Sequence, residues 1–215
     1  MHGNIVLVWV WGTGMSWLAS FLHVLWFSNI IWIDSTASQM TDNLQKKWIQ
    51  VIIWHGKYEV TEYDQVIYSA AAKESPEVHQ AKETAFATKK RAHPPLLFHQ
   101  FLGELSKLFF TIAVTWSHGK STTTAMTWTS CIECDPKFGF AIVAAPVTQW
   151  EWEQFVINPE HKETITSLIR SRFDPKAPRQ ESLMKSLHFV VECDEYNKHF
   201  LRCLLYTSDA ADEAK

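Results

Sequence analysis

The residues best suited to chemistry lie in the stretch "TWSHGKSTTT". An apolar run, Phe110–Thr115, precedes Gly119, Lys120 and Ser121, and a threonine-rich helix start follows, as in loops that bind nucleotide phosphates. Backbone N–H groups would cradle the phosphates, Lys120 would neutralise their charge, and the Ser121 hydroxyl would bind Mg²⁺. The general pattern is incomplete, because it places glycine five residues before Gly119, where this chain has Val114.

A later apolar run, His188–Glu195, ends in the three acids Glu192, Asp194 and Glu195. In phosphate-loop proteins a carboxylate at the end of a neighbouring strand helps to hold the metal. We therefore predict that Glu192 and Ser121 converge on one Mg²⁺. The alternative is a solvated strand end with no ligand.

A second glycine turn lies near the N-terminus, in "WVWGTGMSWLA". An expected strand precedes it, an expected helix follows, and a second strand ends at Asp34, about 20 residues after the turn. This order is typical of a dinucleotide-binding βαβ unit. The alternative is a membrane span, because Ile5 to Ile33 contains no Asp, Glu, Lys or Arg. Turn residues in the middle of the run argue against it.

The elements that must position these residues alternate along the chain. Strands are expected at Ile49–His55 and Gln65–Ala71, and a helix at Ser75–Phe86, with Pro76 near its start. Such alternation predicts an α/β fold: a Rossmann-like N-terminal domain with a parallel sheet, followed by part of a P-loop ATPase α/β domain. The polar segment Asn158–Ser186 shows no clear period, so a long loop or insertion is expected there.

Composition excludes several classes of protein. The net charge of −3 and the pI near 6.4 argue against a general nucleic-acid binder. Four cysteines in 215 residues do not make a disulfide framework. The pair in "CIEC", Cys131 and Cys134, is either a redox pair, half a zinc site without a second half, or two ordinary thiols. Glycine is scarce, with 7 residues where about 15 are usual, while tryptophan reaches 11.

Four segments together resemble one family. "VTWSHGKSTTTAM" resembles the ATP loop of the Mur ligases, and "WVWGTGMSWLA" resembles the N-terminal glycine-rich signature of the same family. "IYSAAAKESPEVHQAKE" and "VVECDEYNKHFL" match further segments in the same order. The resemblance covers nearly all of residues 4 to 201, except 158 to 186. It implies a UDP-sugar-binding domain over residues 1–107 and part of the central ATP-binding domain over 108–202.

The resemblance also implies site residues. Lys120 would be catalytic, and Ser121 and Glu192 would ligate the metal. ATP would contact the loop residues Thr115, Trp116, Ser117, His118, Gly119, Lys120, Ser121 and Thr122. The UDP-sugar would contact the residues Trp9, Trp11, Gly12, Thr13, Gly14, Met15 and Ser16, together with Asp34, His55 and Ser69.

The activity implied is an ATP-dependent carbon–nitrogen ligation in peptidoglycan precursor synthesis, with ATP and Mg²⁺ as cofactors. The γ-phosphate would pass to the lactyl carboxylate of UDP-N-acetylmuramate, and the amine of L-alanine would attack the acyl phosphate. We expect a cytoplasmic enzyme without nucleic-acid or membrane partners. Three alternatives stay open: a ligase that recycles a tripeptide onto the same UDP-sugar, an NAD-dependent dehydrogenase, and a membrane-anchored interaction protein.

Seven tryptophans stand where the family has glycine: Trp9, Trp11, Trp17, Trp32, Trp48, Trp54 and Trp116. Trp26, Trp128 and one of Trp150 or Trp152 are further candidates. Our hypothesis is that the source organism reads the codon UGA as glycine, and that translation with tryptophan at UGA produced this sequence. A turn that approaches a pyrophosphate needs residues without side chains, which agrees with glycine at these sites.

The last residues form a separate anomaly. "CLLYTSDAADE", after Arg202, has no counterpart in the family and equals the translation of a transposon-end adapter used in sequencing libraries. We expect residues 203–215 to be non-biological, and the chain to be a fragment of a longer protein.

Overall fold

The computed structural model describes residues 3–9, 15–88, 94–115, 118–173, 177–178 and 180–193. Several predicted site residues lie outside these ranges: Trp11, Gly12, Thr13, Gly14, Trp116 and Ser117. The acids Asp194 and Glu195 and the expected adapter tail also lie outside. The chain divides into two compact units, one made of residues 1–101 and 169–179, the other of 102–168 and 180–215.

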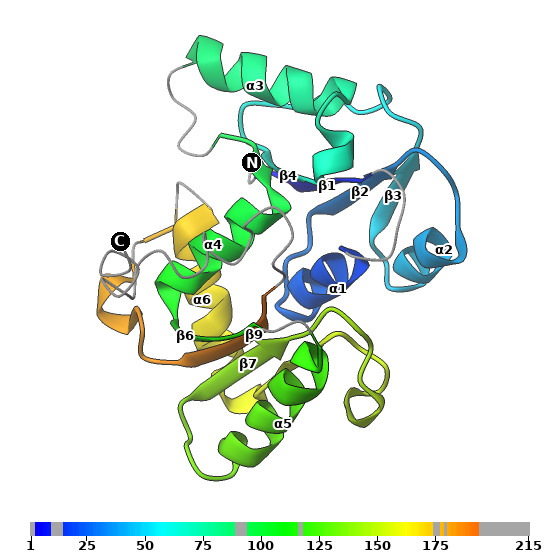
Figure 1. The fold of residues 1–215 in the computed structure, drawn as a ribbon. Helices are drawn as coiled ribbons and strands as arrows, with labels where there is room; N and C mark the ends of the chain where they lie inside the picture. The colour runs from blue at the N-terminus through cyan, green and yellow to red at the C-terminus, as the bar shows by residue number, and fades with distance from the viewer. Residues whose placement is uncertain are drawn as a thin grey trace, which may run out of the picture. The chain divides into compact units, whose positions relative to one another are not determined.

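The first unit contains a fully parallel five-stranded sheet. In spatial order its strands are β3 (Gln50–Ile53), β2 (Ile30–Asp34), β1 (Ile5–Trp9), β4 (Gln65–Tyr68) and β5 (Leu96–Leu97). The helices α1 (Ser16–Val24) and α2 (Gln39–Lys46) lie on one side of this sheet, and α3 (Pro76–Thr88) lies on the other (Figure 1). The short helix η1 (Ala70–Ala72) follows β4. The carboxyl ends of β1 to β4 therefore meet at one edge, which is where open α/β sheets bind ligands.

Both faces of this sheet are covered, which explains its continuous apolar strands. Val6 and Val8 pack with Val78 and Ala81 of α3. Because side chains alternate along a strand, Leu7 faces the opposite side, and it is fully buried.

The segment considered as a membrane span, Ile5 to Ile33, holds β1, α1 and β2 instead. Each of these elements is short, because the turn residues and Asn29 interrupt the apolar run. In the part of the chain that the structure describes, no helix is both long enough and apolar enough to span a bilayer.

The second unit contains a four-stranded sheet in the order β6 (Phe110–Val114), β9 (His188–Glu192), β7 (Phe138–Ile142) and β8 (Phe155–Ile157). The first three strands are parallel and β8 is antiparallel. The helix α5 (Lys120–Ile132) covers one face of this sheet (Figure 1). On that face Trp128 packs in one cluster with Phe138 and Val190. Two further helices, α4 (Phe98–Leu108) and α6 (Lys162–Phe173), each contribute residues to both units, and three short helices follow loops: η2 (Thr148–Trp150), η3 (Pro159–His161) and η4 (Glu181–Leu183).

The prediction of a loop over Asn158–Ser186 is wrong, because α6 occupies twelve residues of it. Ile165, Leu168, Ile169 and Phe173 are buried at helical spacing. The polar and charged residues between these positions made the helical period hard to recognise in the sequence. The strands β7 and β8 were not predicted either.

Four tryptophans adopt left-handed backbone conformations, which favour glycine. Their φ angles are 60° at Trp26, 62° at Trp48, 81° at Trp54 and 64° at Trp152. All four side chains are exposed, so burial of the indole does not offset the backbone strain. Of Trp150 and Trp152, Trp152 is the better candidate for a position that is naturally glycine, because only Trp152 has a positive φ. These backbones support the hypothesis of glycine at these four positions.

Candidate functional site: two ligand-binding edges

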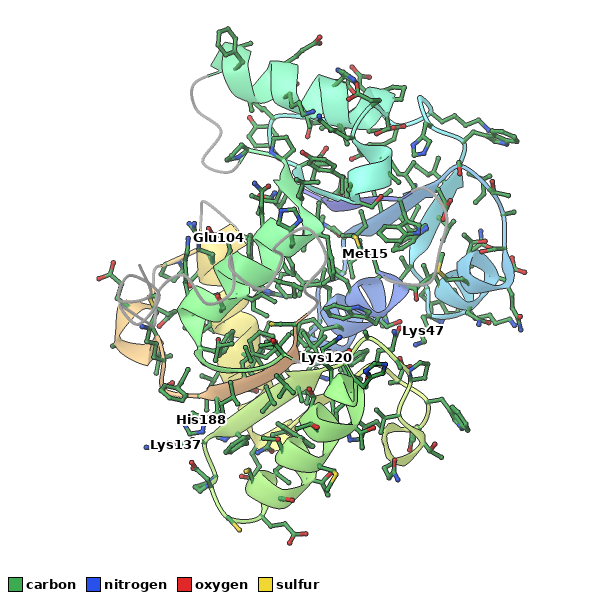
Figure 2. The ribbon with its side chains drawn as sticks, in the orientation of Figure 1. Met15, Lys47, Glu104, Lys120, Lys137 and His188 are labelled. Atoms are coloured by element: carbon green, nitrogen blue, oxygen red, sulfur yellow. The ribbon has the colours of Figure 1, made fainter. Side chains whose placement is uncertain are left out.

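The described part of the loop before α5 ends at Gly119, whose backbone is left-handed. Gly119 is the N-cap of α5, with φ 77°. A Cβ at Gly119 would meet no atom within 4 Å, so the left-handed backbone, and not lack of space, favours glycine there. The N–H of Thr123 donates to the Gly119 carbonyl at 2.8 Å and closes the first turn. Lys120 begins the helix just beyond the end of β6 (Figure 2).

Ser121 and Glu192 come together at this edge although 71 positions separate them. The strands β6 and β9 are neighbours, and their register pairs Val114 with Glu192. The Ser121 hydroxyl donates to Glu192 Oε2 at 2.7 Å, and the Ala144 N–H donates to the same oxygen at 2.7 Å. The predicted convergence of the two side chains is therefore present.

The side-chain oxygens of Ser121 and Glu192 are suitable ligands for a hard divalent cation. Mg²⁺ takes oxygen ligands at 2.0–2.1 Å in octahedral geometry, which places adjacent ligand oxygens about 2.9 Å apart. The separation of 2.7 Å between Ser121 Oγ and Glu192 Oε2 is close to that spacing. No cluster of three His, Cys, Asp or Glu side chains with metal-site geometry occurs among the described residues. The two oxygens therefore fit two adjacent ligand positions of such a cation.

The remaining described residues of this loop are accessible. Thr115, His118 and Thr122 are exposed, and Lys120 is half-buried. Of the eight residues predicted to contact ATP, the six that are described therefore surround the start of α5.

Some of the predicted residues around the N-terminal turn, at the carboxyl edge of the first sheet, have a structural role. Met15 is fully buried, so its side chain belongs to the core and only its backbone can face a ligand. Ser16 is the first residue of α1. Trp9 ends β1, and its ring lies 6.4 Å from the ring of the fully buried Trp32.

Asp34 and Ser69, both predicted for the UDP-sugar site, are buried at the ends of β2 and β4. Asp34 Oδ1 accepts from the Thr36 N–H at 3.3 Å. The Ser69 hydroxyl accepts from the Ala72 N–H at 3.2 Å and caps η1. Both side chains thus shape the turns at this edge.

His55 contacts a residue that sequence reasoning missed. Its Nδ1 lies 3.2 Å from Oε2 of Glu77, and the Gly56 N–H donates to Oε1 of Glu77 at 2.5 Å. Glu77 lies in the first turn of α3, directly after Pro76. The only signal for it was an acid at a helix start, which usually indicates capping rather than a site.

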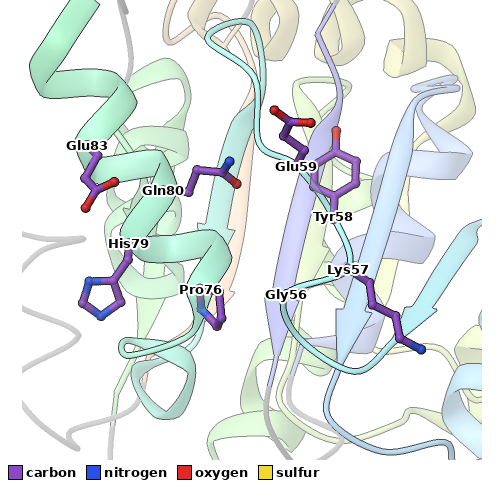
Figure 3. Close-up of a pocket in the computed structure, with 8 residues that line it drawn as sticks. All are labelled: Gly56, Lys57, Tyr58, Glu59, Pro76, His79, Gln80 and Glu83. Atoms are coloured by element: carbon purple, nitrogen blue, oxygen red, sulfur yellow. The ribbon is translucent and has the colours of Figure 1, made fainter.

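A cavity of about 530 Å³ adjoins this contact (Figure 3). It is lined by Gly56, Lys57, Tyr58, Glu59, Pro76, His79, Gln80 and Glu83. The Tyr58 hydroxyl donates to Asp64 at 3.0 Å and accepts from the Asn4 amide at 2.8 Å. Burial, with a smaller effect of the neighbouring Asp64, raises the pKa of Tyr58 to about 12.

The two edges define a class of protein: an α/β chain in which a parallel sheet of the dinucleotide-binding type precedes a sheet with a candidate phosphate-binding loop. Curated relatives are similar to this chain in sequence. The chain is 34% identical over 125 residues to UDP-N-acetylmuramate–L-alanine ligase of Acetivibrio thermocellus, covering 57% of this chain and 25% of that protein. It is 38% identical over 125 residues to the ligase of the same name from Dichelobacter nodosus, covering 58% and 24%. The predicted resemblance to the Mur ligases is confirmed.

The fold is shared with a solved Mur ligase. UDP-N-acetylmuramate:L-alanyl-gamma-D-glutamyl-meso-diaminopimelate ligase from Neisseria meningitides superposes with a TM-score of 0.55 at 19% identity, covering 90% of this chain and 54% of that one. No protein-family model matches the chain. The chain spans about a quarter of the length of the curated relatives that it matches.

Proposed function

We propose that the chain is part of an ATP-dependent ligase that joins L-alanine to UDP-N-acetylmuramate. Residues 1–107 would bind the UDP-sugar, and 108–202 would form part of the ATP-binding domain. The observation that carries the proposal is the contact of Ser121 with Glu192 beside the Gly119 turn. Oxygen donors for a cation and helix N–H groups for phosphates meet there at one strand edge.

Each side chain has a role in this reaction. Lys120 would hold the β- and γ-phosphates, and Ser121 and Glu192 would hold Mg²⁺, which supplies charge neutralisation for phosphoryl transfer. The chain's residues would position the γ-phosphate against the lactyl carboxylate, since such transfers depend on positioning and electrostatics. The amine of L-alanine would then displace phosphate from the acyl phosphate. This product accounts for the name that the sequence relatives bear.

The test uses a full-length protein with glycine at the tryptophan positions. Phosphate release is measured with ATP, UDP-N-acetylmuramate and L-alanine. Lys120→Ala should abolish it, whereas Lys137→Ala, an exposed lysine of the same unit, should leave it unchanged. Near-normal release by Lys120→Ala would contradict the role of that lysine.

A second candidate is the tripeptide ligase, which the name of the structural neighbour suggests. Replacing L-alanine by L-alanyl-γ-D-glutamyl-meso-diaminopimelate in the same assay distinguishes the two. Turnover with the tripeptide and none with L-alanine would select the second candidate. None of the three proteins compared above is named as a dehydrogenase.

A further inference from the structure

Gln154 contacts the segment after β7 that donates a hydrogen bond to Glu192. The Gln154 backbone carbonyl accepts from the Val143 N–H at 2.9 Å, and its side-chain amide donates to the Ala144 carbonyl at 2.5 Å. Between these two groups lies the peptide that joins Val143 to Ala144, and the N–H of this peptide donates to Glu192 Oε2 at 2.7 Å. Gln154 therefore holds the peptides on both sides of the one that contacts the carboxylate.

The pairing of β7 with β8 places Gln154 at this point. The two strands are antiparallel, and their register pairs Ile142, the last residue of β7, with Phe155, the first residue of β8. The residue after β7 therefore stands opposite the residue before β8, which is Gln154. The backbone hydrogen bond between them does not involve the side chain at position 154. A substitution there should leave the strand pairing in place.

The orientation of the Glu192 carboxylate depends on its hydrogen-bond partners. A glutamate side chain has several rotatable bonds, and holding it in one rotamer costs entropy. Oε2 accepts from the Ser121 hydroxyl and from the Ala144 N–H. Because a carboxylate oxygen has two lone pairs, Oε2 can keep the bond from Ala144 while it binds a cation. Mg²⁺ requires near-ideal octahedral geometry, so an oxygen that is already oriented suits it.

We propose that Gln154 is a positioning residue that fixes the Ala144 peptide and, through it, holds the Glu192 carboxylate in the orientation that binds Mg²⁺. The inference rests on the proposed function, because it takes the cation from there. Partners that hydrogen-bond to metal ligands orient those ligands, and their removal typically weakens metal binding roughly 10–100-fold.

Replacing Gln154 by leucine removes the side-chain donor at similar volume and without a change of charge. In the full-length protein with glycine at the tryptophan positions, ATP binding is measured by calorimetry over a series of Mg²⁺ concentrations. Gln154→Leu should raise the half-saturating Mg²⁺ concentration about tenfold and leave ATP binding without Mg²⁺ unchanged. General damage to the loop would weaken both. The control is Gln149→Leu, at an exposed glutamine of the same connection, which should change neither.

A double-mutant cycle tests whether Gln154 acts through Glu192. If it does, Gln154→Leu should have little further effect in a protein that already carries Glu192→Gln, because the carboxylate that it orients is gone. An equal shift of the half-saturating Mg²⁺ concentration in both backgrounds would show that Gln154 does not act through Glu192. That result would overturn the inference.

The Ala144 amide gives a readout that needs no cation. Ala144 is exposed, so its N–H should exchange slowly with solvent only if the bond to Glu192 is kept. We expect slow hydrogen exchange at Ala144 in the protein without nucleotide and faster exchange in Gln154→Leu, with the Val143 amide still protected. Fast exchange at Ala144 before any substitution would overturn the inference. If Gln154→Leu does not fold, Gln154→Glu, which keeps the shape and lacks the donor, replaces it in each measurement.

The results separate the inference from the proposed function. An unchanged half-saturating Mg²⁺ concentration in Gln154→Leu would overturn the inference and leave the ligase proposal intact. The expected shift in a full-length protein without ligase activity would support the inference and contradict the proposed reaction. ATP binding that does not respond to Mg²⁺ in any variant would overturn both.

Discussion

Trp26 and Trp48 hold the same position in two different helices, the first residue beyond the C-cap of α1 and of α2. Their φ angles are 60° and 62°. In both helices the N–H of the next residue donates to the carbonyl oxygen five residues earlier, at 3.1 Å. This hydrogen-bond pattern is the Schellman motif, whose left-handed position is usually glycine.

Replacing Trp48 by glycine should stabilise the first unit. The indole is 92% exposed, so its removal loses little burial, while relief of the left-handed strain should contribute about 1 kcal/mol. The free energy of unfolding in urea measures the gain. Lys46→Gly, two residues earlier and inside α2, is the control and should cost about 1 kcal/mol. A loss of stability in both variants would contradict the glycine interpretation.

The gene should settle the same hypothesis directly. We expect UGA codons at the tryptophan positions, including the left-handed Trp54 and Trp152, and ordinary glycine codons at Gly119. Peptide mass spectrometry of the protein from its source should show glycine at those UGA positions. A gene with UGG at all of them would exclude recoding.

Binding of the UDP-sugar should depend on the tryptophans around the N-terminal turn. An indole there keeps backbone N–H groups from the pyrophosphate, which they must approach to about 2.7–3.2 Å. Trp9, Trp11 and Trp17 replaced together by glycine should therefore convert absent or weak binding of UDP-N-acetylmuramate into measurable binding by calorimetry. Trp128→Gly, far along the chain in α5, is the control and should restore none. Equal binding by the unaltered chain and the triple variant would argue against recoding at this turn.

Binding of Mg²⁺ should depend on both Ser121, at the start of α5, and Glu192, at the end of β9. Ser121→Ala and Glu192→Gln should each weaken Mg²⁺-dependent ATP binding by about tenfold or more in the glycine-restored full-length protein, because the first removes an oxygen ligand and the second removes the negative charge of another. Binding of ATP without Mg²⁺ should change less. The exposed Ser130 of α5 serves as the control through Ser130→Ala. Variants that retain the full Mg²⁺ effect would contradict a shared cation.

Stability of the first unit should fall at alkaline pH. Burial raises the pKa of Tyr58 from 10.0 to about 12, so the unfolded chain loses this proton first. The contribution of Tyr58 is then complete below pH 10 and is lost as the pH rises toward 12. Tyr58→Phe should reduce the slope of stability against pH in that window. Part of the slope should remain, because burial also raises the pKa of Tyr68. An unchanged slope would show that Tyr58 titrates alike in both states.

The sequence was sufficient for features that depend on local pattern. Buried apolar runs predicted β1 to β4, β6 and β9 but not the parallel strands β5 and β7, and the rule that parallel strands end at one edge predicted the approach of Ser121 to Glu192. The helix α6 was missed because its buried positions, such as Ile165 and Leu168, alternate with polar residues. Glu77 was missed because what distinguishes it is its contact with His55, 22 positions away, which no local sequence pattern indicates.

The position of β9 has a consequence for how the second unit assembles during synthesis. This strand lies between β6 and β7 in the sheet, yet it is the last of the four to leave the ribosome. Until β9 has been synthesised, the edges of β6 and β7 that it joins have no partner strand. Unpaired strand edges can form hydrogen bonds with other chains. Any nascent chain or proteolytic product that ends before His188 therefore lacks the central strand of the sheet and the Glu192 carboxylate. Such a chain should aggregate rather than fold.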